Sequence, residues 1–272
     1  MLKKFFGRRA KSVEPKAVIP GAKDGGHGDH WGCLLQSVQE KELIPFLTDV
    51  TRKDNHPYTF DFGPGSTDKG LAFYSNGTPL RACVLVANQM LASAYPEVQD
   101  GPVWPITITE IIPWSNGLEG QIAGTCHGAA VAFFDTRFYA NWRRYDVGQT
   151  YDFHMGALGY TVGRAPQSEV ETELGAKVSL DGAHAYMPAN LDNEAADVDD
   201  LWFHSPLEGE KDSAYLIGPP IYSYPIVMAI PEDFEMKLDV YCGAHVLAPD
   251  MKNIQPNDDI QGYLWLLGYL AQ

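Results

Sequence analysis

The sequence predicts a mainly β fold with a few short helices (α+β), arranged as two tandem OB-like small β-barrels preceded by a helix-containing N-terminal region. Glycine (26) and proline (19) are abundant, and 12% of the residues are aromatic, as expected for many short strands joined by turns. A strand, strand, strand, short helix, bulged strand order is typical of the OB-like five-stranded barrel. With 272 residues, 45% of them hydrophobic, the chain is long enough for one large or two small domains.

The first hundred residues divide into a tail and a folded region. Residues 1–30 are predicted to be a basic tail and a Gly-rich linker, because VEPKAVIPGAKDGG combines prolines and glycines. Residues 31–100 are predicted to hold an N-terminal helix and strands that pack on the barrels. Apolar residues recur at helical spacing over 33–50, where Pro45 breaks or kinks the helix, so that two short helices are an alternative to one. The turn sequences FGPGS and SNGT separate the strands that follow.

Residues 101–165 are predicted to form the first OB-like unit. The strand-like segments VWPITITEIIPW, GLEGQIAGTC and AAVAFFD are followed by a short helical segment, TRFYANWRRY. Asp135 is suited to cap that helix, whose Phe138, Trp142 and Tyr145 share one face. The strand QTYDFHMGALGYTV shifts its alternation at Gly156, which indicates a β-bulge that bends it around a small barrel.

Residues 201–272 are predicted to form a second OB-like unit, after an acidic linker at 166–200. The segments LWFHSPLEG, IYSYPIVMAI and MKLDVYCGAHVL are strand-like, and PNDDIQGYLWLLGYL provides the last strand. LLGY at 266–269 matches ALGY at 157–160, so we interpret the two units as an internal duplication. No helix is evident between the third and fourth strands of this second unit.

The motifs FFDTRFY…YDVGQTYDFHMGALGY and, later, DDIQGYLWLLGYL resemble a group of uncharacterised bacterial proteins. That group shares an FFDT-type strand, a G-x-x-Y-x-F…AL-x-Y strand and a terminal G-x-LWL-x-G segment. The resemblance covers about residues 104–160 and 200–270. It implies a shared fold, and it carries no known activity or catalytic residue to this chain.

The charge distribution bears on partners. The net charge is −15, yet residues 1–23 hold seven basic residues and one acid, which leaves 13 basic and 34 acidic residues in the rest of the chain. Such an acidic body repels phosphate backbones, so nucleic acid is disfavoured as a partner and another protein is favoured. The N-terminal cations Lys3, Lys4, Arg8 and Arg9 fit a solvated terminus, an anionic membrane surface or an acidic partner.

The cysteine pattern and the N-terminus bear on localisation. The four cysteines lie far apart, and the basic start is not followed by an apolar signal segment. We therefore expect a cytoplasmic protein with reduced thiols, with peripheral attachment at the inner membrane surface as an open alternative.

The stretch GAKDGGHGDHWGC gathers Asp24, His27, Asp29 and His30, which are residue types that bind zinc and other divalent metals. A second ligand pair of matching spacing is missing nearby, and the glycines make such a segment costly to order. We therefore expect a linker with no metal and no cofactor, and keep a metal site as the alternative.

Cys126 and His127 form a second candidate, as a nucleophile and its base in a Gly-flanked turn. Neighbouring strand residues point to opposite faces, which argues against a catalytic pair. The adjacent acids at 199–200 and 258–259 are typical of turns before strands. The sequence contains no P-loop, G-x-G-x-x-G after a strand, G-x-S-x-G or H-E-x-x-H.

The last strand, IQGYLWLLGYL, has two apolar faces. Only one face can line a small barrel, so the other is either covered, by the other barrel or by helix 33–50, or exposed to a partner. The candidate binding residues are the aromatic side chains Tyr263, Trp265, Tyr269 and Trp142.

These observations favour a non-catalytic binding or adaptor protein that uses an aromatic face. Two alternatives stay open. One is a hydrolase-type enzyme that uses Cys126 or a His27/His30 metal site, and the other is single-stranded nucleic-acid binding through the barrels.

Overall fold

The structure is a computed structural model that describes residues 27, 30–36, 40–54, 56–61, 69–166, 169–171, 177–191 and 197–271. The basic tail with Lys3, Lys4, Arg8 and Arg9 lies outside the described residues, as do Asp24 and Asp29. The described chain is mainly β-strand with a few short helices, which confirms the predicted fold class at this level.

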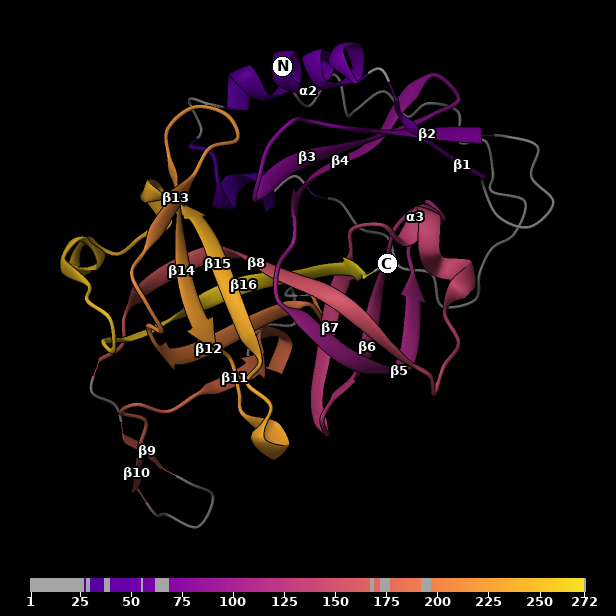
Figure 1. Cartoon of the computed structure of the whole chain (residues 1–272). Coiled ribbons are helices and arrows are strands. Elements are labelled where there is room, and N and C mark those ends of the chain that lie inside the picture. The colour runs from indigo at the N-terminus through magenta and orange to yellow at the C-terminus, as the bar shows by residue number, and fades with distance from the viewer. Residues whose placement is uncertain are drawn as a thin grey trace.

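The N-terminal region is an antiparallel sheet covered on one side by a helix (Figure 1). Its strands, in order across the sheet, are β1 (Tyr58–Asp61), β2 (Lys69–Tyr74), β3 (Leu80–Ala87) and β4 (Met90–Val98). Helix α2 (Glu40–Lys53) packs on β2 and β3 and continues across Pro45. Of the two predicted effects of Pro45, a break of the helix is therefore wrong. The predicted start at residue 33 is replaced by a separate 3₁₀ turn, η1 (His30–Cys33).

Five strands of the described chain close into a barrel. They are β5 (Val103–Pro113), β6 (Gly120–Cys126), β7 (Ala129–Asp135), β8 (Thr150–Arg164) and β16 (Asp259–Leu270). β5 pairs antiparallel with β6 and β8, β6 pairs antiparallel with β7, and β7 lies parallel to β16. The ring closes because β16 also pairs antiparallel with β8.

The short helical connection between β7 and β8 agrees with the sequence. It consists of α3 (Phe138–Asn141) and η2 (Trp142–Arg144), and it turns Phe138, Trp142 and Tyr145 toward the core. Arg137, rather than Asp135, occupies the N-cap position. Asp135 still supports the turn, because its Oδ1 accepts a hydrogen bond from the Arg137 backbone N–H at 2.9 Å.

Two separate tandem barrels are not confirmed. The described C-terminal strands extend the same sheet, whose order is β11-β12-β16-β7-β6-β5-β8-β15-β14-β13. The added strands are β11 (Ala185–Pro188), β12 (Asp200–Pro206), β13 (Asp212–Ala214), β14 (Ile221–Val227) and β15 (Lys237–Gly243). β12 pairs with β16, β15 lies parallel to β8, and a single bridge joins Leu207 to Ile226. The last strand, predicted for a second unit, thus closes the first barrel.

Short elements complete the described chain. A small hairpin, β9 (Glu169–Glu171) with β10 (Lys177–Ser179), falls within the predicted acidic linker. Four 3₁₀ turns follow: η3 (Ala189–Leu191), η4 (Pro231–Asp233), η5 (Ala244–Val246) and η6 (Pro249–Asn253). The last two lie between β15 and β16, where no helix was expected from the sequence.

The pairing of β8 with β16 brings the two matching sequence motifs together. Ala157 of ALGY lies opposite Leu266 of LLGY, which holds the same place in its own motif. The register shifts where Thr161 and Gly159 oppose Tyr263 and Leu264, so the bulge is at Tyr160 rather than at Gly156. Gly156 has another role, because a Cβ at this position would lie 2.5 Å from the Cβ of Val98.

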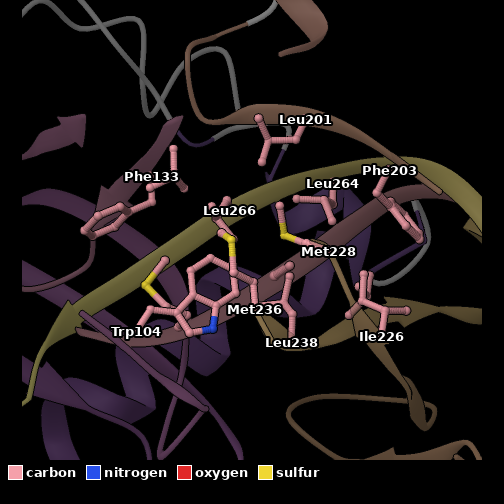
Figure 2. Close-up of a cluster of buried hydrophobic side chains, with 14 of the residues drawn as sticks. Trp104, Phe133, Leu201, Phe203, Ile226, Met228, Met236, Leu238, Leu264 and Leu266 are labelled. Atoms are coloured by element: carbon pink, nitrogen blue, oxygen red, sulfur yellow. The ribbon is translucent and has the colours of Figure 1, made fainter. Parts of the chain in front are cut away.

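Two hydrophobic cores in the described chain lie on opposite faces of β8 and β16. The first joins residues of both predicted units, as Figure 2 shows for Trp104, Phe133, Leu201, Phe203, Ile226, Met228, Met236, Leu238, Leu264 and Leu266. The second lies between the barrel and the N-terminal region and includes Trp31, Leu34, Leu35, Tyr95, Phe134, Leu158, Trp265 and Leu267. Both faces of the last strand are therefore covered from Leu264 to Leu270, whereas Tyr263 is exposed.

Candidate functional site: a histidine in an aromatic cage

Four aromatic side chains, which we call the aromatic cage, surround the ring of His27: Tyr95, Trp114, Phe134 and Trp265. Their ring centroids lie 5.0, 5.0, 4.7 and 5.6 Å from the imidazole, in that order. β4, β7 and β16 carry three of them, and Trp114 directly follows β5. The cage thus forms where the N-terminal sheet meets the outer face of the barrel.

The imidazole of His27 is nearly enclosed. Its exposed fraction is 7%, it stacks on Trp114 with an interplanar angle of 20°, and it meets Phe134 edge-on at 71°. Offset stacking and edge-on contacts are the favoured geometries for such rings. A ring held in this way is fixed in both position and plane.

A buried carboxylate, Glu119, closes one end of the cage. Its Oε1 lies 2.5 Å from His27 Nε2 and accepts a hydrogen bond from Ser93 Oγ at 2.7 Å, and its Oε2 accepts one from Asn116 Nδ2. The loop between β5 and β6 sets this position, because Asn116 Oδ1 also accepts the backbone N–H groups of Leu118 and Glu119. Glu119 is therefore oriented by three partners, as a buried charge requires.

His30 forms a second ring beside the first. Its Nδ1 lies 2.9 Å from His27 Nδ1, and its ring stacks on Trp265 at a centroid distance of 3.8 Å and an angle of 3°. A hydrogen bond between two ring nitrogens contains one proton, so one imidazole donates and the other accepts. Burial lowers the pKa of His30, and the neighbouring His27 lowers that pKa further.

Asp199 forms a hydrogen bond with the indole of Trp265, the ring on which His30 stacks. Its Oδ2 accepts Trp265 Nε1 at 2.9 Å, and its Oδ1 accepts Gln121 Nε2 at 2.8 Å. Burial raises the pKa of Asp199 to about 7, with the nearby acids Asp197 and Asp200 acting in the same direction. Gln121 Oε1 is buried without a partner among the described residues.

This arrangement is suited to recognition more than to nucleophilic catalysis. In a catalytic triad the base lies between the nucleophile and the acid. Here the carboxylate of Glu119 lies between Ser93 and His27, so the serine hydroxyl faces the carboxylate and not the imidazole. Within the described ranges, no group of three or more His, Cys, Asp or Glu residues is arranged to hold a metal ion.

The structure unites only part of the predicted metal candidate. His27 and His30 come together, but their Nδ1 atoms face each other, and Asp24 and Asp29 lie outside the described residues. The linker interpretation is wrong for the two histidines, because His27 is buried and both pack against aromatic rings of the body.

Cys126 and His127 do not form a catalytic pair. Cys126 ends β6 inside the first core, where burial raises the pKa of its thiol to about 11. A nucleophilic cysteine needs the opposite shift. His127 and Gly128, with φ of 46° and 83°, make the two-residue hairpin turn, and the His127 ring stacks outside on Phe234.

The predicted aromatic face is mostly interior. Trp265 and Tyr269 are 0% and 4% exposed, so an exposed patch is wrong for these two. Tyr269 packs under the guanidinium of Arg137, whereas Tyr263 reaches the surface with an exposed fraction of 43%. Trp142 is half-buried beside Arg143.

Sequence reasoning missed the residues that complete the site. Glu119, Asn116 and Ser93 carry no recognisable motif, and Glu119 meets His27 across 92 positions of the chain. Asp199 was interpreted as a turn residue, yet it is 1% exposed and bonded to Trp265. One signal was available, namely a histidine pair followed by an apolar WGCLL segment, which is typical of a buried rather than a linking stretch.

Comparison with known proteins identifies no relative of this chain. No family model, no curated protein and no solved structure matches this chain significantly. The resemblance to uncharacterised bacterial proteins therefore stays a prediction. In the part of the chain that the structure describes, no helix combines the length and the apolar character needed to cross a membrane.

Proposed function

We propose that this protein is a non-catalytic binding protein whose ligand site is the aromatic cage with Glu119. One observation carries the proposal: an imidazole from a distant segment is bound by four aromatic rings and a buried carboxylate. Aromatic cages with an acidic group are a recurrent means of recognising cationic and planar nitrogen groups. The alternative is a purely structural role, in which His27 is a core residue and the cage binds no ligand.

The position of the cage supports a binding role. In OB-type barrels, ligands bind on strands two and three and at the loop between strands one and two. β5, β6 and β7 hold the places of strands one to three in the barrel described above, with β7 parallel to the closing strand. Trp114 and Glu119 flank the corresponding loop, and Phe134 lies on β7.

We also propose that the barrel strands derive from two OB-like units that share β8 and β16. Three pairings support this: β7 is parallel to β16, β15 is parallel to β8, and Ala157 opposes Leu266. Each unit would then complete the other's sheet, because the fourth strand of one lies beside the third strand of the other. This extends the predicted internal duplication.

The test of the binding role is to empty the cage and refill it with a free ligand. In the full-length variant His27→Gly, an imidazole-sized site opens beside Glu119. We expect imidazole to bind this variant with a dissociation constant on the order of 1 mM and to raise its unfolding temperature. Isothermal titration calorimetry and thermal unfolding measure the two effects.

The matched control is His127→Gly, since His127 is exposed in a hairpin turn whose positive φ suits glycine. It should show no imidazole effect, and adding Glu119→Gln to His27→Gly should abolish the binding. Circular dichroism confirms that each variant is folded. If folded His27→Gly neither binds imidazole nor is stabilised by it, the cage is core packing and the proposal is wrong.

A further inference from the structure

We propose that the cage recognises a histidine-bearing segment of a partner protein, and that His27 and His30 of this chain are its internal competitor. This inference rests on the proposed binding function, and it adds the class of ligand and the way in which access is controlled. The two histidines of this chain that occupy the cage indicate which chemical groups an external ligand must present.

The first step is the shape of the site, which has two flat slots. One slot lies against Trp114 with Phe134 edge-on, and it ends at Glu119. The other lies flat on Trp265, as the 3.8 Å and 3° stacking of His30 shows. The two rings meet through their Nδ1 atoms at 2.9 Å. A ligand must therefore present two planar rings with a nitrogen on the shared edge.

The second step is the count of donors. An imidazole places one N–H on Glu119 and offers its other nitrogen to the second ring, so both of its polar atoms are satisfied. A phenyl ring would leave Glu119 without this partner, and a buried carboxylate that loses a hydrogen bond on binding lowers the affinity. An arginine has five N–H donors, and the aromatic walls would leave most of them unpaired. Histidine pairs spaced H-x-x-H fit best.

The third step is that the cage is held by contacts that do not involve its occupant. Glu119 is fixed by Ser93 and Asn116, and Trp265 is fixed by Asp199. Such support keeps a site in its binding geometry when it is empty. Ser93 and His30 are partly exposed and Asn116 is exposed, so this side of the cage borders the surface.

The fourth step is competition. A ligand that belongs to the same chain as its site is present at a high effective concentration, whatever the concentration of the chains in solution. An external segment must displace it, so its apparent affinity falls by the fraction of chains in which the site is open. Replacing both His27 and His30 in the full-length chain should therefore raise the affinity of the cage for an external segment.

The experiment uses the peptide acetyl-GGHGDH-amide with a fluorescent label, titrated with full-length chains and followed by anisotropy. We expect His27→Gly/His30→Gly to bind it at least tenfold more tightly than the wild-type chain. Adding Glu119→Gln should reverse at least tenfold of that gain. A peptide with glutamine in place of both histidines should not bind, and the control chain His56→Gly/His127→Gly should behave like wild type.

The outcomes separate this inference from the proposed function. If the double variant is folded and binds free imidazole but not the peptide, the cage is a ligand site and recognition of a histidine segment is wrong. If wild type and double variant bind the peptide equally, the internal competitor is wrong. If neither imidazole nor peptide binds the folded double variant, the proposed function itself fails.

Discussion

At the scale of single residues, Asp199 shows how burial changes the chemistry of a side chain that looks ordinary in the sequence. A carboxyl group in a turn normally titrates near pH 4. Here it is enclosed between Gln121 and Trp265, with two further acids close by, and burial raises its pKa to about 7. The folded state thus holds this proton more tightly than the unfolded chain does.

The sign of the resulting pH dependence follows directly. The stabilisation from protonated Asp199 is complete below about pH 4 and is lost as the pH rises through about 7. We expect the free energy of unfolding of the wild type to fall between pH 5 and pH 8, with up to about 3 kcal/mol due to this group. In Asp199→Asn the fall should be smaller, because residue 199 no longer titrates. It should not vanish, because Asp135, with a pKa also raised to about 7, still contributes.

Urea unfolding at several pH values measures this slope. The control is Asp181→Asn, which changes an exposed aspartate on the surface. Equal slopes for Asp199→Asn and Asp181→Asn would show that Asp199 does not carry the raised pKa.

At the scale of elements, Gly156 of β8 is required by packing and not by a bulge. A Cβ at Gly156 would lie 2.5 Å from the Cβ of Val98 on β4, inside the space of a well-packed core. We expect Gly156→Ala to lower the free energy of unfolding by about 1–3 kcal/mol, as overpacking does. Gly32→Ala should have little effect, because nothing lies within 4 Å of a Cβ at Gly32.

The double variant Gly156→Ala/Val98→Gly tests the contact itself. Glycine at position 98 removes the Cβ at 2.5 Å and the two methyl groups at 2.7 and 2.8 Å, so the two changes should couple favourably and the loss should be smaller than the sum of the single losses. Chemical denaturation of the four chains gives the coupling energy. Strict additivity would mean that the close approach of β4 to β8 is not the cause.

The pairing of β8 with β16 is the element-level feature that distinguishes one closed barrel from two tandem ones. Thr161 and Tyr263 are opposite each other and both exposed, so cysteines at these positions lie within reach of a disulfide. We expect Thr161→Cys/Tyr263→Cys to cross-link readily within one chain under mild oxidation. Mass spectrometry detects the bond, and the native cysteines do not compete because all four are buried.

A matched pair provides the control for this cross-link. Met187 is exposed on β11, which is separated from β8 by β12 and β16, so Thr161→Cys/Met187→Cys should remain reduced. A cross-link in the control pair, or none in the test pair, would contradict the strand order.

At the scale of the whole molecule, the N-terminal region and the barrel share the second core. Trp31, Leu34 and Leu35 pack with Leu158 and Trp265, and Trp31 Nε1 donates to the Ala94 carbonyl at 3.0 Å. The docking of His30 on Trp265 belongs to the same contact. The two regions are therefore expected to be coupled through this segment.

Acidification should loosen this contact. The pKa of His30 is lowered in the folded state, so the stabilisation from the neutral ring is present above about pH 6.5 and is lost as the pH falls below it. The charged or titratable groups facing His30 are His27 and, beyond it, Glu119, with Tyr160 and Asp199 on the side of Trp265. We expect amide exchange in residues 30–35 to speed up severalfold from pH 7.5 to pH 5.5, after correction for intrinsic rates.

The variant His30→Phe separates titration from stacking. Phenylalanine can stack on Trp265 but does not titrate, so exchange in residues 30–35 should respond little to pH. Amides of β3, in the middle of the N-terminal sheet, serve as the internal reference. If His30→Phe responds to pH as strongly as wild type, His30 is not the group that titrates.

Local features of this protein were determined by the sequence. The alternating segments from 103 to 135, the hairpin turn at Cys126–His127–Gly128, and the shared face of Phe138, Trp142 and Tyr145 follow from side-chain periodicity and turn chemistry, which act over a few residues. The predicted mainly β class follows from the sum of these local preferences.

Only the tertiary structure decided which strand closes the barrel and what lies against Trp265. Strand order depends on pairings across the chain, and a periodic pattern says that a face is buried but not what buries it. The meeting of His27 with Glu119 and of Asp199 with Trp265 depends in the same way on distant segments packing together. Local physics therefore determined the elements, and long-range packing determined the cage.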